Sequence, residues 1–332
     1  MLKILGTRLR SFRETQAISQ QQLSDETLIA REQISRIENG LINPTIETIV
    51  KLSKALNVSL SELFGKTQLL DKIKSLMPPT YDTYYEPFLG GGALFFNLTP
   101  EKAVISDFNE ELMIAYQCFK DKNCFELMVN QIIKHEKNHN ETYYYDVRSM
   151  DRQPDYKTMK DSIKAARLIY LNKACFNGLY RVNSKGFFNV PSAKRKVVNA
   201  YNETLFKDIQ TYFNSASIEV LSGDFEAAVK DAKKGDFVYF DPPYDTLEEQ
   251  NNFTTYTKDA FGKEEQVRLS NVFKDLDKRG VFIMLSNHNT PFIQNLYKGF
   301  NINVVLARRS INSKGDGRGA VEEVIITNYS HE

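Results

Sequence analysis

The chain has 332 residues, of which 42% are hydrophobic and 26% are charged, a composition typical of globular proteins with a sizeable core and room for two domains. Its formal net charge of +1 excludes a global electrostatic attraction to nucleic acid, so any such binding must come from local patches of charge. No signal peptide and no apolar run of membrane length are recognisable, so we expect a cytoplasmic protein without a membrane partner.

The cysteines and histidines exclude two further classes. Cys118, Cys124 and Cys175 lack the spacing of metal ligands and are too few for a disulfide scaffold. We therefore expect three reduced thiols. The four histidines are scattered singly, so no metal site is predicted.

Residues 1–64 predict a small all-helical domain. Apolar residues recur at helical spacing and predict five short helices, with Ser19 and Thr45 as expected N-caps. Residues 27–40 follow the helix-turn-helix pattern, in which Gly40 ends the second helix and its exposed face enters the DNA major groove. The side chains expected to reach base edges or phosphates from that face are Arg31, Gln33, Ser35 and Arg36.

The sequence of this head resembles a known family. The run "SQQQLSDETLIAREQISRIENGLINPTIETIVKLSKALNVSLSELF" is similar to the phage-repressor-like helix-turn-helix proteins. The resemblance implies DNA binding, and a homodimer through the head would suit a palindromic operator. A purely structural or protein-contact role is the alternative.

The boundary to the next domain is abrupt. No Gly/Ser linker follows the head, so a second domain is predicted from residue 65 to residue 332. Ser61–Phe64 are expected to serve both as the last helix of the head and as the first turn of the second domain.

The second domain opens with two predicted strands that end in polar or flexible residues. Residues 83–93 predict a strand, a turn of three glycines and a helix, and glycines let the backbone approach a ligand closely. Residues 103–107 predict a strand that ends at Asp107, where a doubly wound fold places the acceptor for ribose hydroxyls. By themselves, the two features only suggest a nucleoside cofactor.

A third predicted strand, residues 237–240, runs into Asp241-Pro242-Pro243-Tyr244. Two consecutive prolines make this a rigid corner at the carboxyl end of a strand, where open α/β sheets bind ligands. A carboxylate, a proline carbonyl and a flat ring suit the binding of a planar amine. The alternative is a strand that simply ends in a Pro-Pro turn.

The stretch from about Cys124 to Phe213 is too long for a simple crossover and predicts an inserted domain. Within it, Lys185-Gly186 fits the tip of a β-hairpin. Residues 181–199 carry five basic residues and no acidic one. Such a run is usually a solvated face, but the neighbouring Phe187 and Phe188 favour contact with phosphates and bases.

In their order along the chain, these motifs resemble the class I S-adenosylmethionine-dependent methyltransferases, and specifically the Dam-type adenine-N6 DNA methyltransferases. The resemblance covers about residues 65–329 and is carried by "EPFLGGG" at 86–92, "SDFN" at 106–109, "NKACFNGLYRVNSKGFFNVP" at 172–191, "SGDF" at 222–225, "DPPY" at 241–244, "LSNHNT" and the closing "VEEVIITNY". It implies a Rossmann-like α/β sheet with an inserted target-recognition domain, preceded by the small all-α head.

The resemblance also implies the site residues. Those expected to bind S-adenosylmethionine are Lys66, Glu86, Pro87, Phe88, Gly90, Gly92, Asp107, Asp224, Phe225 and Asp241. The expected catalytic set is Asp241, Pro242, Pro243 and Tyr244, in which Asp241 and the Pro242 carbonyl accept the amine hydrogens and Tyr244 stacks on a flipped adenine. The family usually has an aromatic residue and two glycines before its lysine, whereas one glycine precedes Lys66 here.

Target recognition is implied for the predicted hairpin. The matching positions are Leu179, Arg181 and Pro191, with Asn177 near the orphaned partner base. Arg181 suits guanine O6 and N7, and Leu179 suits a thymine methyl group. The expected target is GATC or another site that begins GAT.

The predicted function is adenine-N6 methylation of double-stranded DNA within a restriction–modification system, with a head that binds operator DNA or adds DNA affinity. One alternative is a transcriptional regulator with a silent methyltransferase domain. Another moves the chemistry to cytosine N4 or to RNA, against which the recognition hairpin argues.

Overall fold

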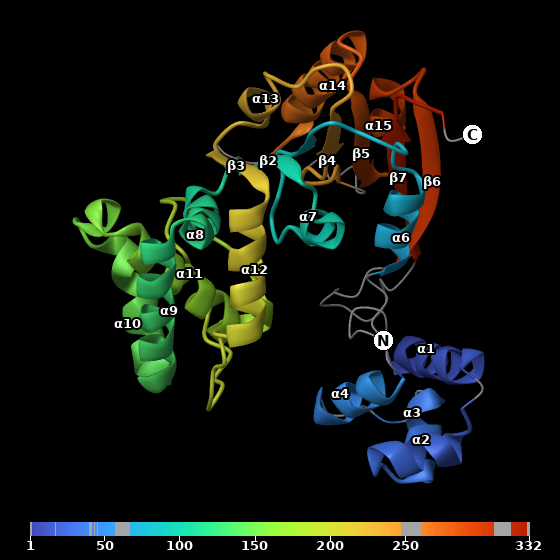
Figure 1. The fold of residues 1–332 in the computed structure, drawn as a ribbon, viewed down its shortest axis with the longest axis vertical. Coiled ribbons are helices and arrows are strands. Elements are labelled where there is room, and N and C mark those ends of the chain that lie inside the picture. Colours follow the sequence, from blue (N-terminus) through green and yellow to red (C-terminus); the bar gives the residue numbers. More distant parts are fainter. Residues whose placement is uncertain are drawn as a thin grey trace. The chain divides into compact units, whose positions relative to one another are not determined.

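The computed structural model describes residues 2–16, 18–39, 42, 44, 46–56, 67–246, 261–308 and 320–330 (Figure 1). The chain divides into two compact units, one of Met1–Met77 with Val305–Glu322 and one of Pro78–Val304 with Glu323–Glu332. The predicted boundary between residues 64 and 65 lies outside the described residues and stays a prediction.

The head contains four of the five predicted helices. They are α1 (Leu2–Thr15), α2 (Gln20–Thr27), α3 (Arg31–Glu38) and α4 (Ile46–Ala55), and α6 (Thr67–Ser75) follows in the same unit. Ser19 caps α2 as predicted, because its side chain accepts from the Gln22 backbone N–H. The Gln22 side chain in turn accepts from the Ser19 backbone N–H. The fifth predicted helix, the predicted cap Thr45 and Gly40 lie outside the described residues.

The apolar side chains of these helices form one small core, which includes Leu9, Leu23, Ile34 and Leu52. Beside it, the buried Glu38 carboxylate at the end of α3 accepts hydrogen bonds from Arg13 of α1, at 2.7 Å and 3.0 Å. This pair joins the second helix of the helix-turn-helix motif to α1.

A seven-stranded sheet has most of its residues in the second unit. Its strands are β1 (Tyr84–Glu86), β2 (Lys102–Asp107), β3 (Ser217–Ser222), β4 (Phe237–Phe240), β5 (Phe282–His288), β6 (Asn301–Arg308) and β7 (Ala320–Thr327), in the order β3-β2-β1-β4-β5-β7-β6. The pairs from β3 to β5 are parallel, and β7 is antiparallel to β5. The strand order reverses direction between β1 and β4, so their carboxyl ends define the switch point where such sheets bind ligands.

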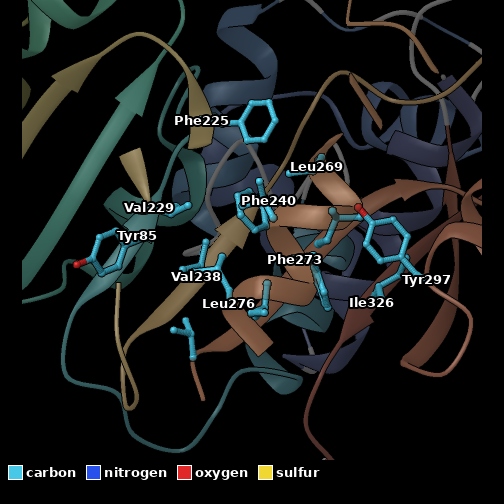
Figure 2. Packing of buried hydrophobic residues seen from close by; sticks show 14 of the residues in the cluster. Tyr85, Phe225, Val229, Val238, Phe240, Leu269, Phe273, Leu276, Tyr297 and Ile326 are labelled. Atoms are coloured by element: carbon cyan, nitrogen blue, oxygen red, sulfur yellow. The ribbon is translucent and has the colours of Figure 1, made fainter. Parts of the chain in front are cut away.

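One face of the sheet is covered by α14 (Lys263–Lys278) and α15 (Pro291–Leu296). Figure 2 shows Val238 and Phe240 of β4 among Leu269, Phe273 and Leu276 of α14. β4 is buried at each of its four positions, as expected for a parallel strand covered on both faces. The corner Asp241–Tyr244 therefore leaves the sheet from a fully packed strand.

A helical region lies between β2 and β3 (Figure 1). It contains α8 (Glu110–Lys120), α9 (Lys122–Lys137), α10 (Glu141–Ser149), η1 (Met150–Arg152), η2 (Tyr156–Thr158), α11 (Asp161–Ala174), η3 (Phe176–Gly178) and α12 (Glu203–Ser215). α11 packs against both α8 and α9. The region lies where the insertion is predicted, although its bounds of about 124 and 213 stay predictions.

The fold class is confirmed: an α/β sheet with a helical insertion, and a separate helical head. The prediction of three reduced thiols is wrong for Cys118 and Cys124, which form a disulfide, whereas Cys175 is free and buried. Asp121 both ends α8 and caps α9, so the chain turns sharply there and brings the two cysteine Cα atoms to 5.0 Å.

The described residues lack two features that would point to other classes of protein. No helix there is long and apolar enough to span a membrane. In the same part of the chain, no group of three or more His, Cys, Asp or Glu side chains could hold a metal ion.

Candidate functional site

The glycine turn after β1 leaves open space beside its backbone. Gly90 and Gly92 have φ angles of 48° and 63°, in the left-handed region that favours glycine. A Cβ atom added at Gly90 or Gly91 would meet no atom within 4 Å. Gly92 then begins α7 (Ala93–Leu98). The turn can therefore accept a ligand close to the main chain.

Asp107 joins this turn to the end of β2. Its Oδ2 accepts from the Gly90 backbone N–H at 2.9 Å, and its Oδ1 accepts from that of Asn109 at 2.9 Å. The Tyr116 hydroxyl donates to the Gly90 carbonyl at 3.0 Å. The structure thus brings together two of the predicted cofactor elements, the glycine turn and the carboxylate, at the switch point of the sheet.

The third predicted cofactor element follows β3 and is already engaged. Arg268 of α14 donates to both carboxylate oxygens of Asp224, at 2.9 Å and 2.6 Å. The same guanidinium lies over the Phe225 ring, 4.2 Å from its centroid. The predicted adenine contacts of Asp224 and Phe225 stay predictions, and Arg268 contacts both groups in the structure.

The remaining residues predicted at the turn are more deeply packed. Phe88 stacks on Phe225 with ring centroids 5.3 Å apart, and Pro87 is buried. Glu86 at the end of β1 is 3% exposed and accepts from the Tyr84 hydroxyl at 2.7 Å. Burial raises the pKa of Glu86 to about 8, so this carboxyl is neutral at pH 7. Lys66 lies outside the described residues.

The corner Asp241–Tyr244 follows β4, beside the end of β1. The register of these strands pairs Tyr84 with Phe237 and Tyr85 with Val238, so Glu86 ends β1 beside β4, the strand that Asp241 follows. Asp241 is exposed to solvent, but nearby protein atoms displace part of the water around its carboxyl group. This desolvation raises the pKa of Asp241 to about 6, while a hydrogen bond with the Tyr244 hydroxyl lowers it.

The predicted hairpin is present in the helical region. Val182 pairs antiparallel with Phe188, and the Asn189 backbone N–H donates to the Arg181 carbonyl at 3.0 Å. Gly186 lies at the tip with a φ angle of 79°. The four residues predicted to read the target are all exposed, and they are Asn177, Leu179, Arg181 and Pro191. We call residues 176–192 the recognition hairpin.

In the head, the predicted contact residues of α3 differ in exposure. Arg31 and Arg36 are exposed, whereas Gln33 and Ser35 are half-buried. Leu28, in the turn before α3, has a φ angle of 57° and is 90% exposed. The face that the helix-turn-helix pattern assigns to DNA therefore carries two exposed guanidinium groups.

Comparison with known proteins places both parts of the chain. Residues 65–311 match the D12 class N6 adenine-specific DNA methyltransferases, and residues 9–63 match a helix-turn-helix family. The chain belongs to the D12 class N6 adenine-specific DNA methyltransferases. It is therefore an enzyme of adenine-specific DNA methylation with an N-terminal helix-turn-helix domain.

Three curated relatives of this methyltransferase match over most of their length. The Type II methyltransferase M1.LlaDCHI of Lactococcus lactis subsp. cremoris is 48% identical over 267 residues, which cover 80% of this chain and 93% of the relative. The Type II methyltransferase M.MjaIII of Methanocaldococcus jannaschii is 39% identical over 80% of this chain and 96% of the relative. The DNA adenine methylase of Vibrio cholerae serotype O1 is 29% identical over 79% of this chain and 92% of the relative.

One solved structure was also compared. The restriction-modification controller protein C.AhdI from Aeromonas hydrophila is 33% identical to the methyltransferase, over 19% of this chain and 96% of that chain, with a TM-score of 0.19.

Sequence reasoning missed the residues that support the hairpin of this methyltransferase. Asp151 accepts from the Phe188 backbone N–H at 2.7 Å, and Arg152 donates to the Phe188 carbonyl at 3.0 Å. Behind them, Arg167 of α11 is 1% exposed and donates to Asp151 at 2.8 Å and to Glu111 of α8 at 3.1 Å. These residues belong to no recognisable motif, and only the tertiary fold reveals them.

A second missed contact joins the hairpin to the cofactor elements. The Tyr180 hydroxyl donates to the Asn109 side chain at 3.4 Å, two residues after Asp107. Asn109 also caps α8, by accepting from the Leu112 backbone N–H at 3.3 Å. The recognition hairpin and the end of β2 therefore touch directly.

Proposed function

We propose that this methyltransferase transfers a methyl group from S-adenosylmethionine to the N6 atom of adenine in double-stranded DNA, at the target GATC. The observation that carries the proposal is the Asp241–Tyr244 corner, which follows β4 at the switch point of the sheet. The glycine turn and Asp107 adjoin it there.

The residues at the switch point fit the methyl donor. The open space beside Gly90 and Gly91 suits close approach of a ligand to the main chain, and the partly exposed Asp107 carboxylate suits ribose hydroxyls. S-adenosylmethionine supplies a methyl group on a sulfonium centre and leaves as a neutral thioether. Glu86, Pro87 and Phe88 would form the floor of this site. Gly92, Asp224, Phe225 and Lys66 are the other residues proposed to hold the cofactor.

At the corner, Asp241 and the Pro242 carbonyl accept the two N–H groups of the adenine amine. This arrangement directs the nitrogen lone pair toward the methyl group at about 3–3.5 Å, and such alignment supplies much of the rate enhancement. The methylated nitrogen then loses one proton, for which the Asp241 carboxylate is the nearby acceptor. Tyr244 stacks on the flipped base, a contact worth about 1–3 kcal/mol.

Four residues of the recognition hairpin are proposed to read the target, and their exposure supports this role: Asn177, Leu179, Arg181 and Pro191. Arg181 uses its Nε to donate to Asn189 at 2.7 Å. A bidentate contact with guanine O6 and N7 would then use the terminal nitrogens of the same guanidinium.

For the head, we propose binding to operator DNA through α3, with contacts from Arg31, Gln33, Ser35 and Arg36. A homodimer through this domain would match a two-fold symmetric operator. The relatives named Type II methyltransferases favour a restriction–modification system in the cytoplasm as the setting. Autoregulation of that system is the role that we assign to the head.

The proposed function is tested by methyl transfer from labelled S-adenosylmethionine to short DNA duplexes. One duplex contains GATC, a second differs from it by one base pair, and a third carries the site already methylated on both strands. Label found as N6-methyladenine in the first duplex alone supports donor, chemistry and target together. Label in the second duplex as well would overturn the GATC assignment, and absence of label from all three would overturn the proposed function.

A further inference from the structure

The main chain on both sides of Tyr244 is held by side chains from outside the corner. On one side, Gln266 of α14 donates its Nε2 to the Pro243 carbonyl at 2.8 Å. On the other side, Asn287 of β5 accepts from the Asp245 backbone N–H at 2.9 Å through its Oδ1. The two peptide groups that flank Tyr244 are therefore both hydrogen-bonded to amide side chains.

These two amides also contact each other. Asn287 donates its Nδ2 to the Oε1 atom of Gln266 at 3.1 Å. Gln266 is 1% exposed and Asn287 is 0% exposed. The hydrogen bonds form a closed circuit that runs from the Pro243 carbonyl through Gln266 and Asn287 to the Asp245 N–H and back along the main chain. Buried amides are costly to leave unpaired, so the circuit has a single arrangement.

Further contacts extend the circuit on the Asp245 side. Thr290 donates its hydroxyl to the Asp245 carboxylate at 2.7 Å, and His288 hydrogen-bonds the Asp245 carbonyl through Nδ1. The His288 ring also meets the Tyr244 ring edge to face, with centroids 5.0 Å apart. Asp245 is thus fixed by its N–H, its carbonyl and its side chain, immediately after Tyr244.

Fixing these two peptide groups fixes the backbone of Tyr244. Its φ angle depends on the peptide that carries the Pro243 carbonyl, and its ψ angle depends on the peptide that carries the Asp245 N–H. Since both groups are anchored to α14 and β5, the Cα–Cβ direction of Tyr244 is set by the sheet and its covering helix. The ring can still rotate about its side-chain torsions χ1 and χ2, but the Cα–Cβ bond from which it extends is fixed.

We propose that Gln266 and Asn287 are positioning residues for methyl transfer, which act by holding Tyr244 where its ring meets the flipped base. This inference rests on the proposed function, in which Tyr244 stacks on adenine. Neither amide touches the base or the cofactor. Their effect on the reaction passes through the main chain of the corner.

The roles of the two amides lead to a distinctive test with Gln266→Glu. A charged glutamate cannot donate to the Pro243 carbonyl, whereas its protonated form can. Burial raises the pKa of a carboxyl group, so protonation of this one is expected within the range from about pH 5 to about pH 8. At the alkaline end, we expect kcat to fall by about tenfold to 10²-fold relative to wild type, because small misplacements at a reacting centre have effects of this size. The ratio of variant to wild-type kcat should then rise as the pH is lowered.

Gln117→Glu is a control for the chemical change alone. Gln117 of α8 is exposed, and it also donates its Nε2 to a main-chain carbonyl, that of Val220, at 2.7 Å. The chemical change is the same, but the carbonyl belongs to β3. The ratio of kcat for this variant to that of wild type should not depend on pH. Asn287→Asp provides a second variant within the circuit, because its charged form accepts from Asp245 but cannot donate to Gln266.

A double-mutant cycle separates positioning from general stability. In a Tyr244→Ala background, Gln266→Glu should lose most of its effect on kcat, because the ring that it positions is gone. Each assay is run below the unfolding midpoint of the variant, and the KM for S-adenosylmethionine should match that of wild type. Additive effects in the cycle, or a pH-independent ratio for both Gln266→Glu and Asn287→Asp, would overturn the inference alone. A wild-type enzyme without activity on any duplex would overturn the proposed function and this inference together.

Discussion

The catalytic corner and the recognition hairpin are built in opposite ways. The corner leaves a fully buried strand, and its main chain is held by buried amides of α14 and β5. The hairpin exposes several of its large apolar side chains, including Phe176 at 52% and Tyr180 at 45%. Its own ladder is short, with an antiparallel pair between Val182 and Phe188. The role proposed for the corner, alignment of one amine, needs fixed angles, whereas the role proposed for the hairpin, reading DNA, needs free side chains.

Side chains of the helical region hold the main chain of the hairpin. Asp151 and Arg152 bind the main chain of Phe188, and Tyr144 donates to the Val190 carbonyl at 2.8 Å. The buried Arg167 guanidinium secures Asp151 in turn. The exposed residues thus stay available for DNA while the strand that carries them is anchored to the helices. Five predictions follow from this comparison.

The largest effect is expected at the corner itself. Asp241→Ala should reduce kcat by about 10³-fold, or about 4 kcal/mol, because it removes a group that contacts the reacting amine. Affinity for S-adenosylmethionine, measured by calorimetry, should change little. Retained methyl transfer would show that another group binds the amine.

A smaller effect is expected when the support of the hairpin is changed. Asp151→Asn keeps the shape of the side chain but removes the charge that pairs with Arg167, a loss of about 2–3 kcal/mol for a hydrogen bond between charged groups. We expect a raised KM for DNA and weaker discrimination between GATC and its single-base variants, with kcat at saturating DNA close to wild type. Steady-state kinetics on the matched duplexes checks this. A fall in kcat alone would instead place Asp151 with the chemistry.

At the hairpin surface, Arg181→Ala should weaken discrimination at the guanine by about 1–3 kcal/mol. Its effect should be confined to that base pair, because the hairpin remains anchored through Phe188 and Val190. The measurement compares kcat/KM for duplexes that differ only at this position. Equal losses on every duplex would mean that Arg181 contacts phosphate and reads no base.

The fourth prediction concerns pH and separates the two regions again. Because the charged form of Asp241 accepts the amine hydrogens and its pKa is raised to about 6, kcat should fall below about pH 6, by about tenfold (1.4 kcal/mol) per pH unit. The KM for DNA, which depends on the hairpin, should not follow this titration. A kcat without an acid limb near pH 6 would remove Asp241 from the proposed role.

The same titration has a consequence for stability. The folded-state pKa of Asp241 lies above its ordinary value, so its contribution to stability is present at acid pH and is lost as the pH rises through about 6. Asp241→Asn should therefore raise the thermal midpoint above that of wild type at pH 8, and this difference should shrink toward pH 4. A difference that does not vary with pH would assign it to packing.

The motifs that sequence reasoning predicted share one property: residues close together in the chain are enough to indicate the conformation of each. Three glycines after a strand, an acidic residue at the end of the next and two prolines after a third each signal their conformation within a few positions. The hairpin was also predictable, because Lys185-Gly186 and the alternation around it describe a turn. Such patterns place the ends of β1, β2 and β4 together once the parallel sheet is assumed.

The supporting residues could not be predicted, because their partners are distant in the chain. Asp151 meets Phe188 across 37 residues, and Gln266 meets Pro243 across 23. The pairing of Arg268 with Asp224 was unpredictable for the same reason, since no residue near Asp224 in the sequence indicates a partner 44 residues away. The disulfide was missed because cysteine counting ignores the sharp turn at Asp121.

The position of the helical region between β2 and β3 has a consequence for how this enzyme family diversifies. β3 is an edge strand of the sheet, and β1 and β4 lie on the other side of β2. An insertion that leaves from β2 and returns through β3 can be lengthened, shortened or exchanged without a break in the central pair β1 and β4. Under the proposed roles of these regions, target preference and methyl transfer would be separate traits in inheritance and in engineering.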